Sequence, residues 1–187
     1  EIYLAGRDFA AAEYYLRKGL AVAPTWDVLH VNMGWLSFYR TNRREEAIQK
    51  FKDAFDLNEY STYALTSWGR MLRERGDFAA AREKYVAALR ASYNDAACEY
   101  GRFIAELEGD GARHEAALAY ADWGDVRMEW ARWSKEGRRP EDAEKQFWQA
   151  IGFYRNAAAR STAVNVEERI REAEKELAAL AEQRLAD

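Results

Sequence analysis

Apolar residues recur along the chain at intervals of three and four positions, which places them on one face of an α-helix. One such stripe begins at Phe9 and ends at Leu20, shortly before Pro24. Similar stripes cover residues 33–57 and 65–89. Few segments alternate as strands do, and the 187 residues include only 2 prolines and 11 glycines, a composition that suits helices. The pattern therefore predicts an all-α protein.

The helical stripes repeat with a period near 34 residues. Each repeat has an alanine followed four residues later by a large side chain: Ala12 and Leu16, Ala47 and Phe51, Ala81 and Tyr85, and Ala116 and Tyr120. The four alanines are 35, 34 and 35 residues apart. A small residue lets two antiparallel helices touch, and a large one a turn away fills the gap beside the contact. A period of this length predicts a stack of helical hairpins.

The repeated residues resemble those of the tetratricopeptide repeat family. The match is fullest in the middle of the chain, at Trp68-Gly69, Leu72, Gly76-Asp77-Phe78, Ala81, Tyr85 and Ala88. The preceding repeat matches at Met33-Gly34, Ala47, Phe51 and Ala54, with one extra residue in its turn at Thr41-Asn42. The resemblance covers residues 1–157. It implies a right-handed α-solenoid of antiparallel helical hairpins.

The sequence departs from the family pattern near both ends of this range. Tyr3 falls where a first helix should end, so we expect a truncated first repeat. Ala116 and Ala143 are only 27 residues apart, seven short of 34, so the last pair of helices is irregular. Gly124 is the only helix breaker in residues 112–136, and one glycine costs about 1 kcal/mol in a helix. We favour one long helix of about 25 residues there, with two short helices meeting near Gly124 as the alternative.

The repeat pattern ends after Tyr154, and residues 158–187 form a linker and a last helix. That helix has one apolar stripe, made of Val166, Ile170, Ala173, Leu177, Leu180 and Ala181. A repeat stack needs a terminal element that shields its last apolar face from water. We therefore expect a C-terminal capping helix, with a short dimerising coil as the alternative.

Residues able to perform chemistry are scattered. Catalysis requires grouped titratable side chains, yet His30 and His114 fall in different repeats. Cys98 is the only cysteine and has no neighbouring histidine at a metal-ligand spacing. We therefore expect no enzyme activity, no metal site and no cofactor.

The charge and the hydropathy of the chain disfavour some classes of binding partner. The net charge is -4 and the isoelectric point is about 5.4, which disfavours nucleic acid because phosphate would be repelled. No apolar run approaches the roughly 20 residues that span a membrane, and no signal peptide is visible at the start. The compartment stays open, with the cytoplasm favoured.

In the tetratricopeptide repeat family, the first helix of each repeat lines a concave groove that takes a peptide. Projecting these helices inward gives nine candidate contacts for a protein or peptide ligand: Val31, Trp35, Tyr39, Tyr63, Thr66, Arg70, Arg73, Arg102 and Arg132.

These candidates suggest a ligand with two chemical features. Trp35 and Tyr39 are one helical turn apart and would form an apolar shelf. Arg70 and Arg102 occupy equivalent repeat positions and would bind an acidic side chain or a C-terminal carboxylate. The family's carboxylate clamp for chaperone tails needs lysine and asparagine where Val31 and Trp35 stand, so the resemblance does not extend to that function.

The expected function is therefore a protein-interaction scaffold. One alternative is a self-assembling structural protein, with apolar surface around Ile2, Tyr3 and Tyr14 or the last helix pairing with a second copy. Another is an accessory domain of a larger enzyme or of a secretion or assembly machine.

Overall fold

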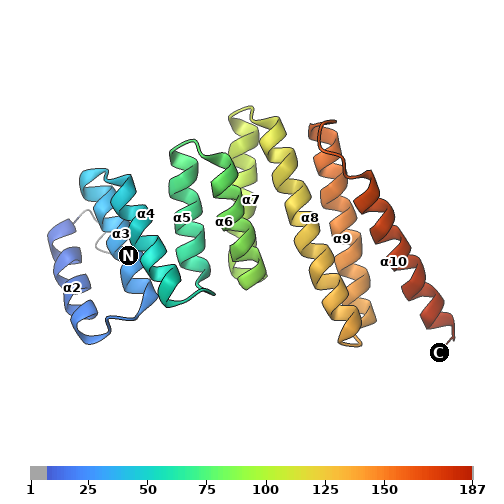
Figure 1. The fold of residues 1–187 in the computed structure, drawn as a ribbon, viewed down its shortest axis with the longest axis horizontal. Helices are drawn as coiled ribbons and strands as arrows, with labels where there is room; N and C mark the ends of the chain where they lie inside the picture. Colours follow the sequence, from blue (N-terminus) through green and yellow to red (C-terminus); the bar gives the residue numbers. More distant parts are fainter. Residues whose placement is uncertain (1–7, 187) are drawn as a thin grey trace. The chain divides into compact units, whose positions relative to one another are not determined.

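The computed structural model describes residues 8–186, and over these residues it is helical without strands (Figure 1). The predicted truncation at Tyr3 lies outside the described residues. The helices are α2 (Phe9–Val22), α3 (Asp27–Thr41), α4 (Arg44–Leu57), α5 (Thr62–Glu74), α6 (Phe78–Ala91), α7 (Tyr93–Gly109), α8 (Arg113–Glu136), α9 (Pro140–Arg160) and α10 (Glu167–Ala186). The all-α prediction is confirmed. The most extensive contacts join sequence neighbours, α3 with α4, α5 with α6 and α8 with α9, as helical hairpins.

The chain turns where the sequence predicts a turn. Gly76 has φ of 84°, a left-handed conformation that glycine adopts without steric cost, and it ends α5. The Asp77 carboxylate then accepts a hydrogen bond from the Ala80 N–H at 3.2 Å and caps α6. In the preceding hairpin, Asn42 has the left-handed conformation with φ of 52°. The loop there covers residues 42–43, against 75–77 in the next hairpin, so the extra residue predicted for this turn lies in α3 instead.

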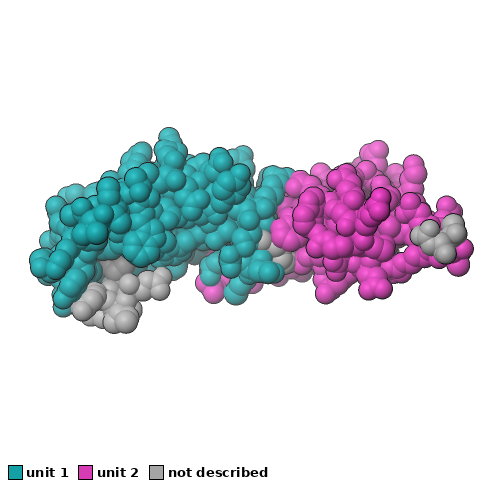
Figure 2. Space-filling model, turned by 90° about the horizontal axis from the view of Figure 1, so that it is seen from below, with its two compact units in different colours: residues 1–100 teal, residues 101–187 magenta. Residues whose placement is uncertain are grey.

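The chain forms two compact units, Glu1–Tyr100 and Gly101–Asp187, drawn in different colours in Figure 2. The boundary falls inside α7, whereas the predicted division at 157/158 follows the end of the repeat pattern. The difference arises because the sequence division reflects periodicity and the structural division reflects compactness. We describe unit 1 (residues 1–100) and unit 2 (residues 101–187) separately.

Unit 1 is held together by glycines that receive aromatic rings from the partner helix of the hairpin. A Cβ at Gly34 would lie 2.6 Å from Cε1 of Phe51, and one at Gly69 would lie 3.0 Å from Cε2 of Tyr85. Real Cβ atoms essentially never come as close as one at Gly34 would, and one at Gly69 would be tighter than most observed contacts, so glycine suits this separation of the helices. The small-and-large pattern read from the sequence is therefore a packing contact.

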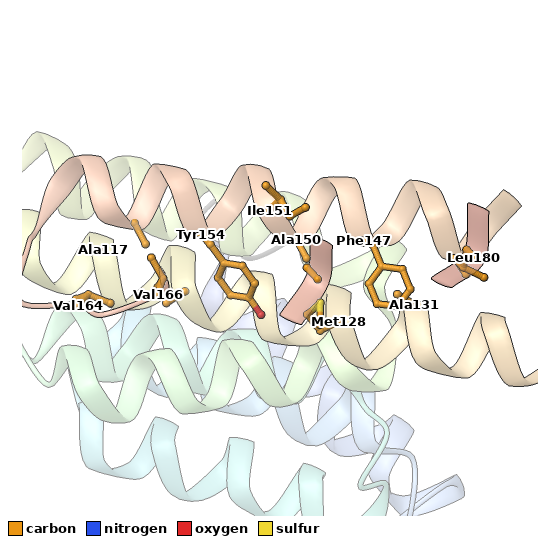
Figure 3. Packing of buried hydrophobic residues seen from close by; sticks show 14 residues of the cluster. Ala117, Met128, Ala131, Phe147, Ala150, Ile151, Tyr154, Val164, Val166 and Leu180 are labelled. Atoms are coloured by element: carbon orange, nitrogen blue, oxygen red, sulfur yellow. The ribbon is translucent and has the colours of Figure 1, made fainter. Parts of the chain in front are cut away.

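Unit 2 contains the long helix. α8 runs without interruption over 24 residues and passes through Gly124, which confirms the single-helix prediction. The apolar core of this unit lies between α8, α9 and α10. Figure 3 shows Phe147 and Tyr154 of α9 pointing toward α8, where Met128 and Ala131 lie.

The apolar stripe of α10 is covered by the rest of unit 2. Val166, Ala173 and Leu180 are buried, and Ile170 and Leu177 pack partly buried against the same cluster. The helix lies against α9. This is the arrangement that a capping helix requires, and it leaves little of the stripe for a dimerising coil.

Candidate binding surface on α3 and α5

The first seven predicted contacts lie on α3 and α5, the first helices of two consecutive hairpins. These two helices touch each other directly in unit 1. The contact places the two helices side by side, and we call the surface of unit 1 that they carry the α3–α5 face. The side chains on this face play different roles.

Trp35 was predicted as a ligand contact on an apolar shelf with Tyr39, but its side chain is buried and supports the α3–α5 face from beneath. Its side chain is only 7% exposed, and its ring lies 5.2 Å from that of Phe51. The indole Nε1–H donates a hydrogen bond to Oγ of Ser67 on α5 at 3.1 Å. Because a buried indole N–H needs a partner, this bond fixes the orientation of the ring and links the two helices.

Tyr39 and Arg70 present the exposed part of the face, and both rest on Trp35. The Tyr39 ring stacks on the indole at 5.6 Å and 22°, and the tyrosine is 47% exposed. The Arg70 guanidinium lies 5.0 Å from the centre of the Trp35 ring and is exposed. Contacts of this kind hold a cation in place over an aromatic face. A tyrosine and an arginine are therefore displayed together on a fixed support.

The arginines near this face differ in whether their charge is paired with a carboxylate. Arg40 forms a salt bridge with Glu13, whose pKa is held below its usual range by hydrogen bonds from Arg17 and Arg40. Arg70 has no salt-bridge partner among the residues that the structure describes. The contact shown for its guanidinium is the one with the Trp35 ring.

Val31 is a correction to the predicted set. Its side chain has 0% exposure and belongs to the core cluster of unit 1. A residue without accessible surface has no contact to offer a ligand. Helical projection placed Val31 on the side of α3 that faces solvent. That side lies next to the side that packs against the next hairpin, and Val31 belongs to the packed side.

The remaining α5 residues are partly exposed and engaged within unit 1. The Tyr63 hydroxyl donates to Oδ1 of Asn32 at 3.2 Å. The Thr66 hydroxyl donates to the Thr62 carbonyl at 2.8 Å, and Arg73 forms a 3.4 Å salt bridge with Glu74. These three side chains are therefore less available to a ligand than Tyr39 and Arg70.

Arg102 and Arg132 belong to unit 2. Arg102 is exposed on α7, and because Arg70 is in the other unit, a joint row of these two cations stays a prediction. Arg132 forms a 2.6 Å salt bridge with Glu172 of α10. Glu172 on the terminal helix is therefore the acidic partner of Arg132, in the place where a ligand was expected.

Sequence reasoning missed Ser67, the residue that orients Trp35. A signal was present, because Ser67 lies three residues after Ala64 and four before Met71, and both of these are fully buried. A hydroxyl at a position that the helical period buries needs a hydrogen-bond partner, so it marks a polar contact inside the stack.

Over the described part of the chain, no three His, Cys, Asp or Glu side chains are grouped so that they could hold a metal ion. None of the helices described is both long and apolar enough to cross a lipid bilayer. No family model matches the chain, and no curated protein is similar enough to count as a relative.

Proposed function

We propose that this protein is an interaction scaffold of the tetratricopeptide type, a right-handed α-solenoid, and that the α3–α5 face of unit 1 binds a segment of a partner protein. The observation that carries the proposal is the shared support of Tyr39 and Arg70 by Trp35. Tyrosine and arginine are the residue types that contribute most to binding energy at protein interfaces. Because both are held by one buried ring, little side-chain entropy would be lost on binding.

The two exposed groups define the ligand. The Tyr39 ring offers an apolar surface for an aliphatic or aromatic side chain. The Arg70 guanidinium can donate two parallel hydrogen bonds to a carboxylate, from either an acidic side chain or a free C-terminus. We therefore propose a peptide in which an apolar residue lies close to a carboxylate, bound without catalysis, metal or cofactor.

Self-assembly is a second candidate, and one surface favours it. Tyr14 on α2 is 60% exposed, and Tyr15 beside it is 53% exposed, with the two rings 5.2 Å apart. Sedimentation velocity over a hundredfold range of concentration separates the candidates. A monomer at every concentration rejects self-assembly, and an oligomer that Tyr14→Ser dissociates supports it.

Peptide selection tests the main proposal. A display library of random sequences with free C-termini is selected against the full chain, and the recovered peptides are synthesised. Titration into the ¹⁵N-labelled protein should shift amide signals of α3 and α5, and amidation of the peptide's C-terminus or removal of its acids should weaken binding. Signals that move only in unit 2 would reject the α3–α5 face as the site.

A further inference from the structure

A second surface of unit 1 exposes large apolar side chains at the ends of the helices. It is formed by the loop between α2 and α3 and the loop between α4 and α5, which lie at the same end of their hairpins (Figure 1). Four exposed residues mark this loop-end surface: Val22 at 83%, Trp26 at 56%, Leu57 at 42% and Tyr60 at 71%. Single exposed apolar residues are ordinary, but four at the ends of α2 and α4 and in the loops that follow them form a surface of the kind that interaction sites use.

The loops are tied to each other and to the helices. Nε2 of His30 lies 2.7 Å from the Pro24 carbonyl oxygen and fixes the first loop to α3. Nδ2 of Asn58 donates to Oδ2 of Asp27 at 3.3 Å, which joins the second loop to the start of α3. The Asn58 side chain also accepts a hydrogen bond from the Tyr60 N–H at 3.1 Å. The loop-end surface is thus ordered before any partner arrives.

The charge of this surface is mainly acidic. Residues 22–30 and 52–64 contain four carboxylates, Asp27, Asp53, Asp56 and Glu59, against one lysine, Lys52, and no arginine. Asp53 pairs with Lys50 of the same helix, whereas Asp56 and Glu59 are exposed and have no salt-bridge partner among the described residues.

The position of Asp56 on α4 is electrostatically unfavourable. It lies in the last turn of α4, which has no basic residue to offset it. A carboxylate there faces the negative end of the helix dipole, which is unfavourable. Lys52 lies one turn earlier but forms no salt bridge with it among the described residues, so the carboxylate can pair with a cationic group of a partner.

We propose that the loop-end surface docks a cationic segment of a partner protein, one that presents lysine or arginine next to an apolar side chain. A cation would lie over the face of Trp26 or Tyr60 while it pairs with Asp56 or Glu59. The apolar neighbour would cover Val22 and Leu57. This surface goes beyond the α3–α5 face, because the two take ligands of opposite charge.

The probe is an acetylated and amidated peptide of repeating Lys-Leu-Gly, titrated into the ¹⁵N-labelled full chain at about 150 mM salt, where long-range attraction is screened. Two matched peptides replace every lysine by glutamate or every leucine by serine. Amide signals of residues 22–30 and 56–62 should move with the first peptide, should not move with the glutamate peptide, and should move at much higher concentration with the serine peptide.

Variants then locate the contact. Trp26→Ser with Tyr60→Ser, and separately Asp56→Lys with Glu59→Lys, should each weaken binding at least about tenfold. The matched controls are Trp133→Ser and the pair Glu83→Lys with Glu182→Lys, which change exposed residues elsewhere and should leave the Kd within about twofold.

Three results would overturn this proposal. One is equal binding of the leucine and serine peptides, which shows a charge effect alone. Another is a shift of amide signals outside the two loops. This result is measured on the wild-type chain, so it counts even if a variant unfolds. The third is self-association that Trp26→Ser abolishes, which assigns the surface to a second copy of the chain.

Discussion

A Cβ at Gly124 would lie 2.6 Å from Cδ1 of Tyr154, so the tyrosine ring occupies the space beside a bare backbone. Gly124→Ala should therefore destabilise unit 2, although alanine favours a helix by about 1 kcal/mol over glycine. Overpacking a filled core costs about 1–3 kcal/mol, which exceeds that gain. Thermal unfolding followed by circular dichroism should show a lower Tm.

Gly152 provides the matched control for this prediction. It lies on α9, the helix that carries Tyr154, and a Cβ there would meet no atom within 4 Å. Gly152→Ala should raise stability by about 0.5–1 kcal/mol. If both alanines raise the Tm, the close approach of Tyr154 to α8 is not what requires glycine at position 124.

The hydrogen bond between Trp35 and Ser67 should be visible in stability measurements. Ser67→Ala leaves the buried indole N–H without its partner, which costs about 1–3 kcal/mol. Trp35→Phe removes the N–H together with the need for a partner. In the double variant, Ser67→Ala should therefore cost less than it does alone, and urea unfolding of the four proteins measures this coupling. Strict additivity would show that the bond contributes nothing.

Tyr154 should make stability depend on alkaline pH. Its hydroxyl donates to Oδ1 of Asp125 at 2.9 Å, and burial together with the Asp125 carboxylate raises the pKa of Tyr154 above its usual range. The stabilisation is fully present below the unfolded-state pKa near 10 and is lost as pH rises above it, because the unfolded tyrosine then ionises first.

Comparison with Tyr154→Phe isolates this effect from the other tyrosines. The stability difference between the wild type and Tyr154→Phe should fall by about 1.4 kcal/mol per pH unit above pH 10. Urea unfolding at pH 9 and pH 11 measures it. A difference that does not change with pH would mean that the folded-state pKa is not raised.

The terminal helix α10 should owe its stability to its apolar stripe more than to its ion pairs. Leu180 is 3% exposed within the core of unit 2, and Leu180→Ala should cost about 2–5 kcal/mol. Glu176 forms a partly exposed salt bridge with Lys135 at 2.7 Å, and such pairs contribute about 0–1 kcal/mol.

Hydrogen exchange separates these two contributions. Leu180→Ala should speed amide exchange throughout α10, while Glu176→Ala should leave it close to that of the wild type. The opposite order would show that the helix is held by its charges.

The sequence alone was enough to predict the helices and the pattern of small and large packing residues, because both depend on the spacing of residues along the chain. The sequence predicted that small residues mark where antiparallel helices touch and that large side chains fill the space beside them, and the contacts of Gly34 with Phe51 and of Gly69 with Tyr85 are of this kind. The role of Gly124 could not be read, since its partner Tyr154 lies 30 residues away and outside the regular period. A glycine that looks like a helix breaker is a site of close packing inside a continuous helix.

The candidate site was harder to predict, because exposure depends on how hairpins pack against each other. Val31 and Tyr39 were placed on one row of α3, yet the first is fully buried and the second is 47% exposed. The pairing of Arg132 with Glu172 depends on where α10 folds back, which no repeat period encodes. Helical projection identifies candidates, and tertiary contacts decide which of them reach solvent.

The central claim is that Arg70, held over Trp35, binds a carboxylate of a partner peptide. The most direct test is the affinity of a selected carboxylate-bearing peptide for Arg70→Glu and for Lys52→Glu, a matched charge reversal on the exposed side of α4. We predict that Arg70→Glu weakens binding more than about tenfold, that Lys52→Glu changes it less than about twofold, and that both variants melt like the wild type. Equal affinities of the two variants would contradict the account.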